Sequence, residues 1–181
     1  VAGTHGNEVN ASWLLDQWSI QPKLLNTCGL NVLSVIGNPL ARSSGKRYVD
    51  RDLNRSFSRD LWDSSDNSCY ESNRAQKLLN LYGHNGRNSS QIVLDLHSTT
   101  SSMGCCLVVY GRRSVDLALA SLIQSRIGLP IYLYEGKGVE TGFLVESWPC
   151  GLVVEIGPVA QGLLHERIIE QSLIAVQICF E

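Results

Sequence analysis

Long apolar runs and an excess of charge are both missing from this sequence. No hydrophobic run approaches the roughly 20 residues that a membrane-spanning helix needs. The formal net charge is only −2, and the charged residues are interspersed, without the basic stripe that binds nucleic acid or an anionic membrane. We therefore expect neither nucleic acid nor membrane as a partner, whereas a homo-oligomer is compatible with the sequence.

Closely spaced cysteine pairs are missing as well. The six cysteines form no CxxC motif and no dense pattern typical of disulfide-linked domains. Cys105, Cys106 and Cys179 lie in apolar stretches and are interpreted as small buried hydrophobic residues. A nucleophilic cysteine is the alternative, but no cysteine has a basic neighbour in the sequence to activate it. The pattern predicts a reducing compartment, and we expect a cytoplasmic protein.

The composition that is present is typical of one globular domain. The chain has 181 residues, of which 44% are hydrophobic and 18% charged, enough to bury a core. Short apolar segments alternate with segments in which apolar residues recur at helical spacing. This alternation predicts an α/β fold, a three-layer sandwich around a mainly parallel mixed sheet. The predicted strands are 30–36, 92–96, 105–110, 130–134 and 152–156, and the predicted helices are 8–18, 71–82, 115–127 and 164–179.

A polar segment from Asn38 to Leu61 interrupts this alternation. It is rich in Arg, Asp and Asn and is too long for a mere connection, so we expect it to line a site. Arg47, Asn54 and Arg55 within it offer cationic and amide donors suited to a carboxylate and to a developing oxyanion. Without context, side chains of these types are more often ordinary surface residues.

The first residues carry an HxxE pair, His5 and Glu8, in a glycine-rich setting before a predicted helix. His97 lies far downstream, at the end of a predicted strand. Two histidines and one glutamate are the ligand set of catalytic zinc, because they leave the fourth tetrahedral position open. Each signal alone is weak, since most HxxE pairs bind nothing and a lone histidine is more often a hydrogen-bonded core residue. Together they predict one Zn²⁺ per chain.

Two carboxylates extend this prediction. Asp95 precedes His97 by two residues, so on a strand both side chains lie on one face and Asp95 can orient a ligand. Glu155 ends another apolar strand, where a buried carboxylate is costly unless it is paired or functional. We interpret Glu155 as a general base, and the alternative is a structural ion pair with an arginine. His84 and His165 lie in polar surroundings and are interpreted as surface residues.

Five motifs follow one another along the chain. They are Gly3-Thr4-His5-Gly6-Asn7-Glu8, Asn38-Pro39, the run RYVDRDLNRSF from Arg47 to Phe57, Asp95-Leu96-His97-Ser98-Thr99-Thr100 and Val154-Glu155-Ile156-Gly157-Pro158. In this order they resemble the aspartoacylase and succinylglutamate desuccinylase family, relatives of the zinc carboxypeptidases. The similarity covers nearly the whole chain and is strongest to the aspartoacylase branch.

The resemblance implies a zinc carboxypeptidase-like catalytic domain over residues 1–181, with a truncated first strand and without the family's C-terminal β-rich domain. It also implies three zinc ligands, a general base, a group that polarises the scissile carbonyl, and two residues that hold the substrate's α-carboxylate. The implied zinc ligands are His5, Glu8 and His97, and the implied general base is Glu155. Arg47 would polarise the carbonyl, and Asn54 and Arg55 would hold the α-carboxylate.

The implied activity is zinc-dependent hydrolysis of the amide bond of N-acyl amino acids. N-acetyl-L-aspartate is the first candidate substrate, giving acetate and aspartate. The stretch 141–146 departs from the family pattern, because aspartoacylases place an arginine there for the substrate's side-chain carboxylate and this stretch has none. A deacylase for other N-acyl amino acids or for N-succinylglutamate is therefore the alternative. A non-catalytic small-molecule binding module of the same fold is a further one.

Overall fold

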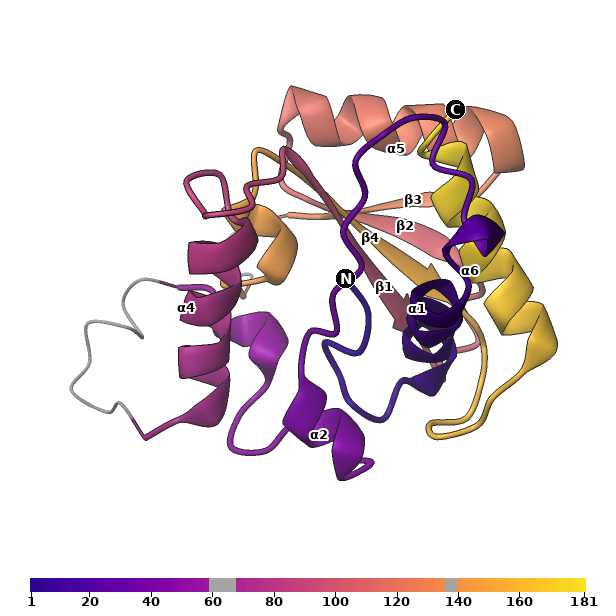
Figure 1. Ribbon diagram of the computed structural model, residues 1–181. Helices are drawn as coiled ribbons and strands as arrows, with labels where there is room; N and C mark the ends of the chain where they lie inside the picture. The colour runs from indigo at the N-terminus through magenta and orange to yellow at the C-terminus, as the bar shows by residue number, and fades with distance from the viewer. Residues whose placement is uncertain (59–67, 136–139) are drawn as a thin grey trace.

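The computed structural model describes residues 1–58, 68–135 and 140–181, which form helices around a four-stranded mixed sheet (Figure 1). The strand order is β1-β4-β2-β3. Two of the three pairings, β1 with β4 and β2 with β3, are parallel, and β2 with β4 is antiparallel. The strands are β1 (Ile92–Ser98), β2 (Cys106–Tyr110), β3 (Ile131–Tyr134) and β4 (Cys150–Ile156). The predicted mainly parallel mixed sheet is confirmed.

Helices cover both faces of this sheet. On one side lie α1 (Val9–Ile20), α5 (Ser114–Ile127) and α6 (Glu166–Ile178), and on the other lies α4 (Tyr70–Tyr82) (Figure 1). Each predicted helix is confirmed, with ends shifted by at most two residues. The three-layer arrangement follows because apolar strands bury both faces only when helices pack on each of them.

The two core regions show how the sheet separates these layers. Along β2, Leu107 and Val109 pack in the core beneath α1, α5 and α6, and Cys106 and Val108 pack in the core beneath α4. This alternation is the period of two expected for an extended strand. Side chains of β1 and β4 on the α4 side therefore share a layer with the polar segment, which is where the predicted site residues meet.

The predicted strand 30–36 is wrong. Of these residues only Ile36 forms a bridge, to Ala2. The Ala2 N–H donates to the Val35 carbonyl at 3.1 Å, so pairing is confined to the end of the segment. Within the described part of the chain, residues 30–35 take part in no β-ladder, and apolar composition without a paired partner strand does not make a strand.

The polar segment contains two short elements, α2 (Pro39–Ser43) and the 3-10 turn η2 (Leu53–Arg55). Asn38 starts α2, because its Oδ1 accepts the N–H of Ala41 at 3.1 Å and proline at the first helical position needs no donor. Residues 59–61 of the predicted segment lie outside the described residues. Two further 3-10 turns are η1 (Pro22–Leu24) and η3 (Leu144–Ser147).

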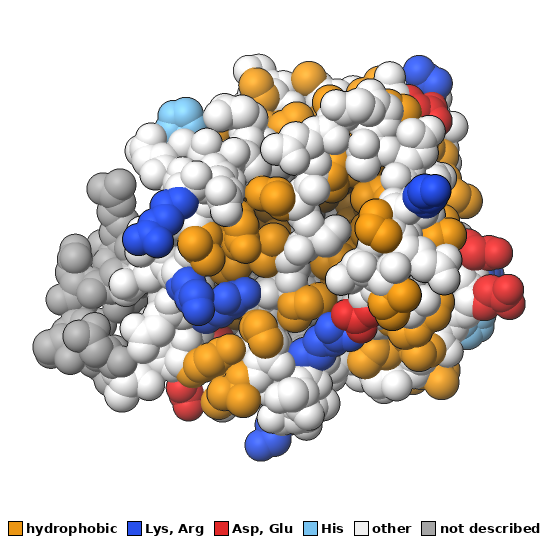
Figure 2. All heavy atoms as spheres, in the orientation of Figure 1, with side chains coloured by type: hydrophobic (Ala, Val, Ile, Leu, Met, Phe, Trp, Pro, Cys, Tyr) orange, Lys and Arg blue, Asp and Glu red, His pale blue; other side chains and the backbone are white. Residues whose placement is uncertain are grey.

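Hydrophobic side chains gather over the middle of the face shown in Figure 2, between α4 and α6. An apolar groove of about 400 Å³ is lined there mainly by residues 30–35 and 89–94, with Trp18, Tyr82 and Trp148. None of the predicted site residues lines this groove.

No helix among the described residues is both long and apolar enough to cross a bilayer. All six cysteines are free thiols, with Cys106 buried and Cys105 and Cys179 half-buried.

Candidate active site

The end of the sheet brings two predicted site residues together. β1 and β4 are parallel, and their register pairs His97 with Glu155. Paired residues of adjacent strands lie about 4.8 Å apart and direct their side chains to the same face. His97 is buried and Glu155 is partly buried. The carboxyl ends of parallel strands thus place an imidazole beside a carboxylate, as is usual for ligand sites in α/β sheets.

The HxxE pair reaches this edge through a tight turn before α1. The Glu8 N–H donates to the His5 carbonyl at 3.1 Å, which folds the two side chains toward each other. Gly6 within the turn lies against α2, where an added Cβ would come within 2.2 Å of the Ala41 backbone. Its N–H also donates to the Arg47 carbonyl at 3.1 Å. Only glycine permits this close approach, so the turn and the polar segment are held together at this point.

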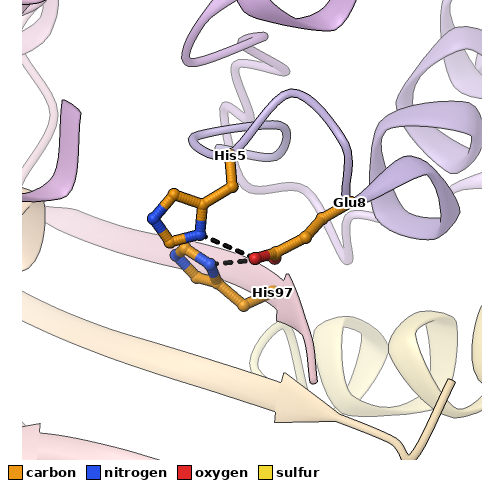
Figure 3. Close-up of side chains that lie close together, drawn as sticks. All are labelled: His5, Glu8 and His97. Carbon is orange, nitrogen blue, oxygen red and sulfur yellow. Dashed lines mark hydrogen bonds and ion pairs between the residues drawn. The ribbon is translucent and has the colours of Figure 1, made fainter. Parts of the chain in front are cut away.

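His5, Glu8 and His97 meet around the Glu8 carboxylate (Figure 3). The Nδ1 atom of His5 lies 2.6 Å from Glu8 Oε1, and the Nδ1 atom of His97 lies 3.0 Å from Glu8 Oε2. The two imidazole rings are edge to face, with centroids 4.8 Å apart. The Ser98 N–H also donates to Glu8 Oε2, at 2.9 Å. All three predicted metal ligands are therefore brought together, with the same nitrogen of each histidine facing inward.

The outward nitrogens of both histidines are held by aspartates. His97 Nε2 lies 2.8 Å from Asp95 Oδ2, and His5 Nε2 lies 3.0 Å from Asp52 Oδ1. Asp95 is in turn fixed by the Thr4 hydroxyl, which donates to its Oδ1 at 2.7 Å. A carboxylate at Nε2 keeps the proton on that nitrogen and leaves the Nδ1 lone pair free for a metal. Asp95 lies against His97, as the sequence predicted. No sequence pattern assigned a role to Asp52, which holds His5 in the same way.

Opposite pKa shifts mark this cluster as rich in negative charge. Burial alone would lower the pKa of His5, but hydrogen bonds to Asp52 and Glu8 outweigh it and raise that pKa. The pKa of His97 rises well above its usual value, because the charges of Asp95 and Glu8 overcome burial. The pKa of Glu8 is lowered in spite of burial, chiefly by the charge of His97. The cluster therefore attracts positive charge strongly.

These residues fit a zinc ion. Two imidazole nitrogens and a carboxylate oxygen are donors that zinc prefers, and one ligand atom from each lies within 4.8 Å of the others. Without a metal, protonation of the two histidines offsets the negative charge of the Glu8, Asp95 and Asp52 carboxylates, as the raised pKa values of both histidines indicate. A divalent cation at His5, Glu8 and His97 would offset that charge in place of the protons.

Arg47 lies at the rim of this cluster. Its Nε and Nη2 donate to Asp52 Oδ2 at 3.2 and 2.9 Å, and its Nη1 lies 3.8 Å from Glu8 Oε1. The side chain is 44% exposed, so the guanidinium borders both solvent and the proposed ligand carboxylate. Asp52 thus connects His5, a predicted metal ligand, to Arg47, the predicted oxyanion-stabilising arginine.

Glu155 has the properties of a proton acceptor. Burial, and to a smaller extent the charge of Glu8, raises its pKa, while the charge of His97 opposes the shift. A carboxylate with a raised pKa accepts a proton more readily at neutral pH. In the described part of the chain no lysine or arginine lies within 4.0 Å of Glu155, so the alternative of a structural ion pair finds no support there.

The hydrogen bonds and ion pairs of Asn54 and Arg55 go to residues other than His5, Glu8 and His97. Asn54 is buried, and its Oδ1 accepts the Leu144 N–H at 2.8 Å. Arg55 donates from Nε to Glu140 at 2.6 Å, and its guanidinium carbon lies 4.0 Å above the Phe143 ring. Both belong to η2, whose first N–H groups are capped by Asp52, since the Asn54 N–H donates to Asp52 Oδ1 at 2.9 Å. They are thus linked to the cluster through Asp52.

His84 and His165 are exposed, as predicted.

Comparisons with known proteins agree with this arrangement. Residues 1–180 match the model of the succinylglutamate desuccinylase/aspartoacylase catalytic domain. Two relatives from Prochlorococcus marinus, one from strain MIT 9313 and one from strain SARG, are each named "probable aspartoacylase". They are 64% and 61% identical to this chain over 181 residues, which is all of this chain and 60% and 59% of the relatives.

Solved structures extend the similarity. The crystal structure of murine aminoacylase 3 is 33% identical, with a TM-score of 0.83 over 98% of this chain and 61% of that chain. Succinylglutamate desuccinylase from Chromobacterium violaceum is 20% identical, with a TM-score of 0.69 over 97% of this chain and 58% of that one, which shows the fold alone.

The predicted zinc carboxypeptidase-like fold is confirmed by these structural matches. The chain spans about 60% of the length of the curated relatives that it matches. The family motifs lie where the geometry joins His5, Glu8, His97 and Glu155 at one end of the sheet. With residues 1–180 matched by the family model, the chain belongs to the succinylglutamate desuccinylase/aspartoacylase family.

Proposed function

We propose that this chain is the catalytic part of a zinc-dependent deacylase that hydrolyses the amide bond of N-acyl amino acids, with N-acetyl-L-aspartate as the first candidate substrate. One observation carries the proposal: the Nδ1 atoms of His5 and His97 converge on the Glu8 carboxylate, beside Glu155 on the next strand. This is a three-ligand set of the catalytic type next to a partly buried carboxylate. The names of the relatives support an N-acyl amino acid as the substrate class.

The side chains present divide the work of hydrolysis among them. When bound, zinc would polarise the scissile carbonyl and make water more acidic at neutral pH. Glu155 takes a proton from the attacking water as the new C–O bond forms at the carbonyl carbon. It returns that proton to the nitrogen as the C–N bond breaks, which yields a carboxylate and the free amino acid. Arg47 supplies positive charge to the oxygen on which negative charge develops.

Asn54 and Arg55 would hold the substrate's α-carboxylate. The ion pair of Arg55 with Glu140 is weak competition, because Glu140 is 63% exposed and such pairs contribute little in water. A substrate carboxylate can replace it and bind the guanidinium in a bidentate manner. Because Asp52 caps η2, the element that presents Arg55 is fixed to the proposed zinc site.

A second candidate is a deacylase for N-acyl amino acids with apolar or aromatic side chains. The ring of Phe143 lies beneath Arg55 and stacks on Tyr110, with centroids 3.9 Å apart, and Tyr134 meets Phe143 edge to face at 5.5 Å. Phe143 belongs to the stretch 141–146, which contains no arginine that could pair with a side-chain carboxylate of the substrate. Phe143 itself is buried, whereas Tyr110 and Tyr134 are partly exposed. Aromatic surface of these two tyrosines near the proposed α-carboxylate clamp would favour an apolar side chain over a carboxylate. N-succinylglutamate stays an alternative of the same reaction type.

Zinc content and a substrate panel test these candidates together. In the natural protein, we expect about one zinc per chain. We also expect N-acetyl-L-aspartate to be hydrolysed with a higher kcat/KM than N-acetyl-L-phenylalanine, N-acetyl-L-leucine and N-succinyl-L-glutamate. Faster hydrolysis of the phenylalanine derivative would select the second candidate. A protein that holds no zinc and cleaves no member of the panel would be a binding module, and the proposal would be wrong.

A further inference from the structure

Glu71 is a buried carboxylate outside the group of proposed catalytic and zinc-binding residues. It lies in the first turn of α4 and is 0% exposed. Its Oε1 accepts the Val49 N–H at 2.7 Å and the Asn38 Nδ2 at 2.9 Å. Its Oε2 accepts the N–H groups of Asp50 and Arg51 at 3.0 and 3.3 Å. Three consecutive backbone N–H groups therefore surround one carboxylate, which is the arrangement of an anion-binding nest.

The backbone that Glu71 holds is the one that carries two site residues. Arg47 precedes the nest by two positions, and Asp52 follows it directly. Asp52 accepts from both His5 Nε2 and the Arg47 guanidinium. With both ends of this stretch so close to the nest, the conformation of residues 49–51 decides whether Asp52 reaches His5. We call residues 47–52 the ligand-support loop.

Further contacts tie α4 to the same surroundings. Asp50 Oδ2 accepts the Tyr70 N–H at 2.7 Å, so the loop and the helix each supply a carboxylate to the other's backbone. One turn beyond Glu71, Arg74 donates to the carbonyls of Gly37 and Ile36, each at 2.7 Å. The segment 36–38 is itself bonded to Ala2 and Gly3 beside the HxxE turn. The start of α4 therefore fixes both chain segments that border His5.

A second metal site is the competing interpretation, because single ligand atoms of Asp50, Cys69 and Glu71 lie within 4.8 Å of one another. Both Glu71 oxygens, however, already accept N–H groups, and Asp50 Oδ2 accepts another. These donors bring positive partial charge to the carboxylates, and a cation would have to displace them. The hydrogen bonds account for the burial of Glu71 without a metal.

We propose that Glu71 is a positioning residue, whose carboxylate holds the ligand-support loop so that Asp52 orients His5 and Arg47 faces Glu8. Glu71 touches neither His5 nor Arg47 and acts on them through the loop. The expected effect of Glu71 on zinc binding and turnover rests on the proposed function. The hydrogen bonds by which Glu71 holds residues 49–51 do not depend on that function.

The test is Glu71→Gln, measured by zinc affinity, kcat/KM and amide hydrogen exchange. Glutamine keeps the shape but turns an NH2 group toward N–H donors, so part of the nest is lost. We expect the N–H groups of Val49, Asp50 and Arg51 to exchange faster, zinc to bind about tenfold more weakly, and kcat/KM to fall about tenfold or more. Zinc affinity and hydrogen exchange would reveal the effect without any substrate.

Asp116→Asn is the matched control. Asp116 is also 0% exposed and also accepts a backbone N–H, from Gly151 at 2.9 Å. Its other partners are the side chains of Arg113 and Cys150 rather than the loop. It should lose stability as Glu71→Gln does, while zinc affinity stays within about twofold. If Glu71→Gln lowers stability but leaves zinc affinity and kcat/KM like those of this control, Glu71 is only structural and the inference is wrong.

Two outcomes keep this inference separate from the proposed function. If Glu71→Gln does not fold, the second variant is Asp50→Ala, which removes the exposed hydrogen bond between the loop and the Tyr70 N–H. We expect this change to weaken zinc binding at least about threefold. Unchanged zinc affinity would refute the inference that α4 holds the ligand-support loop in place. If the natural protein binds no zinc, the proposed function fails, and unaltered exchange of the three loop amides in Glu71→Gln would then refute the positioning role independently.

Discussion

Replacement of Asp52 by asparagine perturbs the proposed zinc site with little change of shape. In the structure Asp52 Oδ1 faces His5 Nε2 at 3.0 Å, and Oδ2 accepts from Arg47 Nη2 at 2.9 Å. Both carboxylate oxygens thus serve donors. Asparagine has one oxygen and one NH2 group, so one of the two contacts must place donor against donor. If the NH2 group faces His5, the imidazole proton moves to Nδ1, which is the nitrogen that zinc requires.

The expected loss of zinc affinity can be bounded from the surroundings of Asp52. Removal of a carboxylate that orients a ligand histidine weakens metal binding about 10- to 100-fold, or about 1.4 to 2.7 kcal/mol. The Asp52 side chain is 19% exposed, so water can replace part of the lost interaction. We therefore expect the lower half of this range, about 10- to 30-fold, with a further fall in kcat because Arg47 loses its partner.

Competition with a chelator of known zinc affinity measures this effect directly. The control is Asp16→Asn, which removes an equal charge from an ion pair with Arg42, with Asp16 44% exposed and far along α1 from the HxxE turn. Its zinc dissociation constant should equal that of the natural protein. A zinc dissociation constant for Asp52→Asn within twofold of the natural value would refute the view that Asp52 sets the tautomer of His5.

Three further replacements separate the proposed roles. His97→Ala should abolish zinc binding or weaken it by orders of magnitude, because two ligands do not hold the metal against water; stoichiometric zinc after dialysis against a mild chelator would contradict the ligand assignment. Glu155→Gln should keep zinc and fold but reduce turnover about 100-fold or more, and near-normal turnover would mean that another group is the base. Arg55→Lys should lower kcat/KM at least about tenfold, or about 1.4 kcal/mol, at unchanged zinc affinity. A substrate with a neutral amide in place of its α-carboxylate should lose little on this change, and equal losses for both substrates would show that Arg55 supports η2 instead.

Local pattern was sufficient for most of the fold. The helices and four of the five predicted strands were predictable because burial on one side of a helix or on both faces of a sheet imposes a period that any single sequence displays. The segment 30–36 has the same apolar composition but is no strand, since a strand also needs a neighbour in register. That neighbour is a property of the assembled chain.

The site divides in the same way. The convergence of His5, Glu8 and His97 could be predicted from residue type and spacing, because metal coordination restricts candidate ligands to a few side chains with stereotyped separations. The sequence also placed Asp95 correctly, since the strand period alone puts it on the face of His97. Only the tertiary structure assigned Asp52 to His5 and Glu71 to the ligand-support loop. Both are carboxylates among many in a chain with 17 acidic residues, and their partners come from segments far away in sequence. Such contacts are decided by how the polar segment packs on α4 and on the HxxE turn, for which no local period exists.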